Sequence, residues 1–294
     1  MANLQAQKPK FSMVIKSDVY QNLIKQTLGD PKKAERYTAA IMSAVATNPS
    51  LQQCEAKTIL SGSLLAESLG LAHSPQLGQY YLVPFKVKAK NGVPEHYDAT
   101  FILGYKGYIQ LAVRSGNYKK INVMEIKEGE FISYNPFDEE IILQPIQDVD
   151  EREKAETIGY YAMFEYINGF KKVMYWSKAQ MLAHADRFSP AFSKAAYEKL
   201  QRGEIPQQDL RCYSSFWYKN FDEMAKKTML RQLISKWGIM STEMTQAVTL
   251  DNTATEISQS GIFETIPESG VETTEIEPQE EPKETAEEVD FNAI

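Results

Sequence analysis

The stretch GYYAMFEYINGFKKVMYW, residues 159–176, decides the fold class. Its two halves, Gly159 to Ile167 and Phe170 to Trp176, are rich in the aromatic and aliphatic residues that favour strands. Between them stands Asn168-Gly169, a dipeptide suited to the positive φ angles of a tight hairpin turn. The sequence therefore predicts an antiparallel β-hairpin with a two-residue loop.

The loop length also predicts the register of this hairpin. If residues 168 and 169 alone form the loop, the strands pair Ile167 with Phe170 and Glu165 with Lys172. The second of these pairs sets opposite charges beside each other, which stabilises an antiparallel pair. We therefore expect Glu165 and Lys172 to face each other across the hairpin.

Helices are predicted on the carboxyl side of the hairpin. Ser177 with Gln180 three positions later forms a capping box, so a helix is expected from Ala179 to Phe188. Residues 189–212 are interrupted by proline and glycine and give no clear element. The next helix is predicted from Tyr213 to Trp237, where Gly238 ends it.

On the amino-terminal side the pattern changes from helical to extended. Apolar residues at helical spacing predict helices over Val19–Leu28, Pro31–Thr47 and Leu51–Ser68. Strand-forming runs separated by turn residues, including Asn91-Gly92, predict strands over Tyr80–Val87, Tyr97–Leu103, Lys120–Lys127, Glu130–Tyr134 and Glu140–Gln144. The expected class is α+β, with amino-terminal helices and antiparallel β-hairpins packed with helices.

Charge and apolar content divide the chain into three parts. It has 32 basic and 39 acidic residues; 13 acidic and one basic lie from Asp251 to Ile294, which leaves 31 basic and 26 acidic before Asp251. The body is therefore +5 and the remainder −12. We expect a flexible arm over residues 1–17, a folded core over residues 18–250, and a disordered acidic tail over residues 251–294, which has few apolar residues to bury.

Composition and motifs exclude several classes of protein. No apolar leader and no run of about 18 apolar residues occurs, so we expect a cytoplasmic protein with no membrane partner. Cys54 and Cys212 lack metal-ligand or redox spacing. No P-loop, HExxH or GxSxG motif occurs, and the carboxylates of residues 138–140 fit a solvated turn better than a Mg²⁺ site. Neither ATP, a metal-binding site nor a catalytic residue is expected, and the sequence leaves a Mg²⁺ requirement open.

The stretch LGYKGYIQLAVRSG, residues 103–116, is the candidate binding element. On a helix from Tyr105 to Ser115, three polar side chains recur every four residues on one face: Lys106, Gln110 and Arg114. Tyr108 lies on the opposite side, and Lys119 and Lys120 follow the helix. The polar and basic side chains, without Tyr108, predict a ridge that contacts phosphates. The ring of Tyr105 is expected to stack on a base. The alternative is a corner between a strand and a helix whose outer charges only face solvent, and this explains the same spacing.

A second basic element is the late helix. Lys227 and Arg231 are one turn apart, Lys226 is adjacent and Lys236 extends the positive edge. A charged helix face can also serve solubility alone. Two basic elements in one fold favour a nucleic-acid groove, because neutralising phosphates requires several cations in line.

Several blocks together resemble the RecT family of phage and prophage recombinases. They are LGYKGYIQLAVRSGNYKKINV (residues 103–123), YYLVPF (80–85), YINGFKKVMYW (166–176) and FDEMAKKTMLRQLISKWGIMS (221–241). The resemblance covers roughly residues 18–250 and implies a core that binds DNA, anneals complementary strands and oligomerises. By similarity, the DNA-facing role extends to Lys106, Gln110, Arg114, Lys119, Lys120, Lys226, Lys227 and Arg231. Tyr105, Tyr108 and Lys236 complete the set of candidate DNA-binding residues.

The resemblance also implies an activity and partners. Such a protein binds single-stranded DNA and the annealed duplex, pairs complementary strands without ATP, and promotes limited strand exchange. It forms rings or helical filaments and works with a phage 5′→3′ exonuclease in the bacterial host cell. The alternative is a passive coat of single-stranded DNA. For the acidic tail we expect an interaction arm, for example toward a host single-strand-binding protein, or a cover for the DNA groove.

Overall fold

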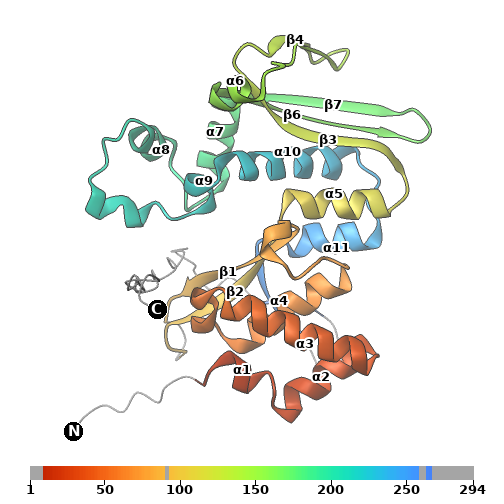
Figure 1. Ribbon diagram of the computed structural model, residues 1–294, viewed down its shortest axis with the longest axis vertical. Helices are drawn as coiled ribbons and strands as arrows, with labels where there is room; N and C mark the ends of the chain where they lie inside the picture. Colours follow the sequence, from red (N-terminus) through yellow and green to blue (C-terminus); the bar gives the residue numbers. More distant parts are fainter. Residues whose placement is uncertain (1–8, 90–92, 258–262, 267–294) are drawn as a thin grey trace, which may run out of the picture.

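The hairpin is part of a three-stranded antiparallel sheet. The structure is a computed structural model that describes residues 9–89, 93–257 and 263–266. In it, β6 (Thr157–Tyr166) lies between β3 (Tyr118–Lys127) and β7 (Lys171–Ser177). The predicted strands are confirmed, and so is the α+β class with antiparallel sheets (Figure 1).

The register of the hairpin differs from the prediction by one residue. The backbone N–H of Tyr166 donates to the carbonyl of Phe170 over 2.8 Å, and Gly169 has a φ of 88°. The loop therefore contains three residues, a common hairpin connection with a left-handed residue at its end. Glu165 faces Lys171 instead of Lys172. The predicted Glu165–Lys172 pair is wrong because the extra loop residue shifts one strand.

A second sheet combines segments that are far apart in the sequence. Its order is β1-β2-β8-β9, with β1 (Tyr80–Val87), β2 (His96–Leu103), β8 (Thr253–Ile257) and β9 (Phe263–Thr265). β1 and β2 pair as predicted, while the turn residues Asn91-Gly92 lie outside the described residues. A separate two-stranded hairpin is made by β4 (Phe131–Asn135) and β5 (Glu140–Leu143).

Helices cover these sheets (Figure 1). The amino-terminal group is α1 (Phe11–Val14), α2 (Asp18–Leu28), α3 (Pro31–Ala46) and α4 (Ala56–Ser68), followed by α5 (Tyr105–Arg114) and α6 (Val149–Lys154). The later group is α7 (Lys178–Phe188), α8 (Lys194–Gln201), α9 (Phe216–Lys219), α10 (Phe221–Trp237) and α11 (Thr242–Leu250). Short 3₁₀ turns span Pro49–Gln53, Pro75–Leu77 and Gln207–Cys212. None of the helices in these described stretches is long and apolar enough to cross a membrane.

Two predicted helices are interrupted. The first starts only at Ala56, because the backbone N–H of Glu55 donates to the carbonyl of Tyr97 over 2.7 Å and holds this segment against β2. The second is divided at Asn220, whose φ of −135° and ψ of 54° are not helical. The capping box of Ser177 and Gln180 is confirmed at the start of α7.

The folded body extends beyond both predicted boundaries. Before residue 18, Phe11 and Ile15 are buried against the amino-terminal helices. After residue 250, Asp251 is buried, and β8 pairs with β2. The boundaries at 17 and 250 are corrected accordingly, because composition averages hide single buried residues. The tail from residue 267 onward lies outside the described residues.

Buried side chains form two cores. The smaller joins α1 to α4 and includes Ile24, Ile41 and Ile59. The larger lies between the β3-β6-β7 sheet, α5, α7, α10 and α11, and includes Tyr108 and Phe164. Because α5 and α10 contribute to the larger core, their polar faces are held in fixed positions at its surface.

Candidate nucleic-acid interface

Two glycines fit α5 tightly against the chain that precedes β1. A Cβ atom on Gly104 would lie 2.1 Å from the carbonyl oxygen of Gly78, and one on Gly107 would lie 2.1 Å from that of Gln79. The N–H of Gly104 donates to the Gln79 carbonyl over 2.9 Å. At the start of α5 the chain's own backbone therefore packs directly against these two glycines.

Substituting Gly107 tests this packing. We expect Gly107→Ala to lower the free energy of unfolding by about 1–3 kcal/mol, since the added methyl group overlaps backbone atoms that cannot rotate away. Urea denaturation followed by circular dichroism measures the change. Val113→Ala is the control on the same helix: it lies on the exposed face and should change stability by no more than about 0.5 kcal/mol. Equal stabilities for the two variants would contradict the close fit.

The start of α5 meets α10 at a group of aromatic and cationic side chains. The Nζ atom of Lys226 lies 4.7 Å from the centroid of the Tyr105 ring, and that of Lys106 lies 5.8 Å from it. Lys226 also pairs with Glu223 over 2.7 Å and with Glu125 over 3.7 Å. Burial alone would lower the pKa of Lys226, but these two carboxylates raise it overall. Lys226 is therefore held as a cation next to the exposed Lys106.

Other predicted residues of α5 point elsewhere. Tyr108 is fully buried in the larger core, so its side chain is not open to a ligand. Arg114 donates to the carbonyls of Leu69 and Gly70, at the carboxyl end of α4. A cation at this position satisfies carbonyls that the helix leaves without partners. Gln110 is exposed on α5.

Two cations of α10, Lys227 and Arg231, converge on one buried carboxylate. Asp251 accepts from Lys227 over 2.8 Å, from Arg231 over 3.0 Å and from the backbone N–H of Leu103 over 2.9 Å. The side chain of Asp251 is 0% exposed, that of Lys227 is 6% and that of Arg231 is 38%. Lys227 is therefore placed in the interior and not on a surface open to DNA, while Arg231 is partly accessible.

The electrostatics of this cluster follow from its burial. Burial lowers the pKa of Lys227, and the charge of Asp251 opposes that shift. Burial and the same carboxylate raise the pKa of Tyr108 well above its usual value. The cluster ties the end of β2 and the start of β8 to α10, and so connects the second sheet to the larger core.

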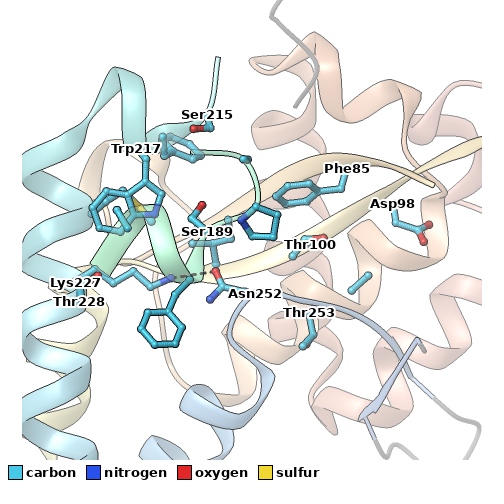
Figure 2. Close-up of a pocket in the computed structure, with 18 of the residues that line it drawn as sticks. Phe85, Asp98, Thr100, Ser189, Ser215, Trp217, Lys227, Thr228, Asn252 and Thr253 are labelled. Carbon is cyan, nitrogen blue, oxygen red and sulfur yellow. Dashed lines mark hydrogen bonds between the residues drawn. The ribbon is translucent and has the colours of Figure 1, made fainter. Parts of the chain in front are cut away.

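A cleft of about 1120 Å³ opens beside this cluster. It lies between α10 and the β1-β2 strands, and Figure 2 shows Lys227 and Thr228 across from Phe85 and Thr100. Its volume exceeds the roughly 300–1,000 Å³ of small-ligand pockets. The lining includes three cations, a carboxylate and three accessible aromatic side chains: Lys88, Lys227, Arg231, Asp98, Phe85, Phe188 and Phe216.

The Tyr105 group adjoins this cleft. The ring of Tyr81 lies 5.8 Å from that of Phe216, which lines the cleft. The Tyr81 hydroxyl and the Lys106 side chain both lie beside Gly78, since a Cβ atom there would be 3.0 Å from the first and 3.4 Å from the second. The structure therefore brings Tyr105, Lys106 and Lys226 near the cleft that Arg231 lines.

Three predicted residues lie at the far end of the β3-β6-β7 sheet. Lys119 pairs with Glu165 over 2.6 Å, and Lys120 lies 3.7 Å from the same carboxylate. Lys236 is exposed near the end of α10, where its Nζ atom is 5.7 Å from the centroid of the Trp237 ring. A DNA contact by these lysines stays a prediction.

Sequence reasoning missed several residues of the cleft and of the cluster beside it. In the cleft, Phe188 is 63% exposed although it ends an amphipathic helix. In the cluster, Asp251 is buried although it begins an acidic stretch. Lys88 and Phe216 lie in segments where the sequence shows no binding motif. The available signal was the large aromatic side chain of Phe188 immediately before a Ser-Pro break.

Comparison with known proteins identifies the family. Over 218 residues the chain is 39% identical to the uncharacterized protein YqaK of Bacillus subtilis strain 168. This aligned region covers 74% of this chain and 64% of YqaK. It thus spans less than two thirds of that relative. Over 219 residues it is 27% identical to Protein RecT of Escherichia coli K12, 74% of this chain and 71% of that protein. The RecT family matches residues 35–265, and the chain belongs to this family.

Proposed function

We propose that this protein anneals complementary single strands of DNA without ATP. Membership of the RecT family supports annealing in general. The observation that carries the proposal is the cleft beside α10, in which cations and accessible aromatic side chains stand together. Proteins that hold single strands without sequence preference combine these two kinds of side chain, because cations attract the backbone and rings stack with bases.

In the proposed complex one strand lies along the cleft. Arg231 and Lys88 line it and contact phosphates, and Lys106 continues the positive surface past Tyr105. Phe188 and Phe216 offer their rings to bases. Phosphate contacts carry no sequence information, so the pairing edges of other bases stay available to a second strand. Annealing makes no covalent bond, so it requires no catalytic residue or cofactor.

The wider assignment is part of the same proposal. The protein promotes limited strand exchange in phage recombination, in the cytoplasm of a bacterial host. It assembles into rings or filaments, binds strands exposed by a 5′→3′ exonuclease, and uses its acidic tail toward a host single-strand-binding protein. In this proposal the DNA-binding core includes the folded segments from Phe11 in α1 to Ile257 in β8.

An annealing assay without ATP tests the function. Two complementary oligonucleotides, one carrying a fluorophore and one a quencher, are mixed with the full chain. We expect pairing to become faster than in protein-free solution. A passive coat of single-stranded DNA, the second candidate, would slow pairing because it shields each strand from the other. Slower or unchanged pairing would contradict the proposal.

Phe188 tests the stacking role of the cleft. We expect Phe188→Ala to weaken binding of single-stranded DNA by about 1–3 kcal/mol, because one base loses its stacking partner. Fluorescence anisotropy with a labelled oligonucleotide measures the affinity. Phe137→Ala is the matched control, since Phe137 is 94% exposed in the β4–β5 turn and is not among the lining residues of the cleft. Equal affinities of the two variants would remove Phe188 from the interface.

A further inference from the structure

Exposed apolar residues gather at one end of the β3-β6-β7 sheet. Ile167 is 71% exposed, Phe170 48%, Ile239 46% and Trp237 39%. They surround Tyr166, whose hydroxyl donates to the carbonyl of Trp237 over 3.2 Å and accepts from the N–H of Ile239, and whose ring stacks 5.8 Å from Phe170. Contiguous apolar surface of this kind marks a contact with another macromolecule.

Lysines border this patch. Lys172 lies with its Nζ atom 4.4 Å from the centroid of the Trp237 ring, and Lys171 is exposed beside it at the start of β7. Lys119 and Lys120 begin β3, which pairs with β6 next to the hairpin loop. Glu165 pairs with Lys119 and Lys120, and Glu139 pairs with Lys172. Four lysines therefore stand against two carboxylates, and the surface stays positive. We call the four apolar residues and these lysines the basic end.

The opposite end of the same sheet is acidic. Helix α6 has the sequence VDEREK and lies just before β6, on the side away from the hairpin loop (Figure 1). Residues 148–156 contain five acidic and two basic residues, and Glu128 joins them through its N–H bond to the carbonyl of Glu156. Val149 stands exposed among them, at 69%. We call this surface the acidic end.

We propose that copies of this chain join head to tail, the basic end of one copy against the acidic end of the next. Two basic ends would repel each other, which disfavours a twofold contact, whereas unlike ends attract. A contact between different surfaces closes into a ring or continues as a filament. The ends are about 30 Å apart, because β6 contains ten residues at about 3.3 Å each. This inference rests on the proposed function only for the expectation that the protein assembles.

Reversing the charge at each end tests the contact. The basic-end variant is Lys120→Glu with Lys171→Glu, and the acidic-end variant is Asp150→Lys with Glu153→Lys. Sedimentation velocity over a concentration series of the full chain, with and without an oligonucleotide, measures the midpoint of assembly. We expect each variant alone to raise that midpoint at least about tenfold, since like charges then meet. An equimolar mixture of the two variants should restore it to within about threefold, because their ends are again complementary.

Further variants separate the contact from misfolding. Ile167→Ser removes an exposed apolar side chain and should also weaken assembly, while the thermal midpoint stays unchanged. Lys25→Glu with Lys32→Glu, on α2 and α3, is the charge control and should assemble like the original chain. Assembly that ignores both reversals, or a mixture of folded variants that fails to recover, overturns the proposal. In another outcome, the basic-end variant loses oligonucleotide affinity at protein concentrations below the assembly midpoint while it still assembles like the original chain. That result would make the basic end a DNA contact and would overturn the proposed contact between copies. Failure of the annealing assay with assembly intact would instead reject the function.

Discussion

Replacing Asp251 with alanine is expected to lower the free energy of unfolding by about 3–5 kcal/mol. The substitution leaves Lys227, whose side chain is 6% exposed, as a buried cation without the carboxylate 2.8 Å away. It also removes the acceptor for the N–H of Leu103 and for the guanidinium of Arg231. Guanidinium chloride denaturation of purified protein measures the loss. This loss is a large fraction of the roughly 5–15 kcal/mol by which an ordinary domain is stable.

Two further variants isolate the cause of this loss. Asp251→Asn keeps the shape and an acceptor oxygen, so any deficit it shares with the alanine variant is due to the missing charge. Asp209→Ala removes an exposed acidic residue and should change stability by no more than about 0.5 kcal/mol. If Asp251→Ala were as stable as Asp209→Ala, the three-residue cluster would contribute nothing to the fold.

Local signals made much of the fold predictable. The capping box at Ser177, the proline-started α3 after Asp30 and the strand on each side of Asn168-Gly169 all depend on residues within a few positions of one another. The Asp30 side chain accepts from the N–H of Lys32 over 2.9 Å, as an N-cap should. The hairpin register failed because two- and three-residue loops fit the same dipeptide, and a change of one residue shifts every pair.

Contacts between distant residues could not be predicted in the same way. The partner of Lys227 lies 24 positions later, in a stretch whose composition indicates disorder. Helical spacing correctly put Lys227 and Arg231 one turn apart, but it gave no information about the carboxylate between them. Lys106 shares the start of α5 with Tyr105, and only the tertiary packing of α10 adds Lys226 to that pair.

The largest effect on DNA binding is expected from two lysines on the accessible surface. Lys88 lines the cleft and Lys106 lies exposed at the start of α5, so neither holds the core together. A charge-assisted hydrogen bond is worth about 1.5–3 kcal/mol. Lys88→Gln with Lys106→Gln should therefore weaken binding of single-stranded DNA about 100-fold or more. Fluorescence anisotropy across a salt series measures the affinity and its dependence on ionic strength.

The salt series distinguishes lost phosphate contacts from general damage. On single strands each phosphate contact contributes about 0.7 to the slope of log affinity against log salt, so the double variant should lose about 1.4. Binding should weaken equally for oligonucleotides of different sequence, because phosphates are alike. Lys16→Gln with Lys32→Gln, on the amino-terminal helical segment, removes the same charge far along the chain and should keep both slope and affinity. A slope equal to that of the original chain would place the bound strand outside the cleft, since two cations removed from a phosphate path must release fewer counterions.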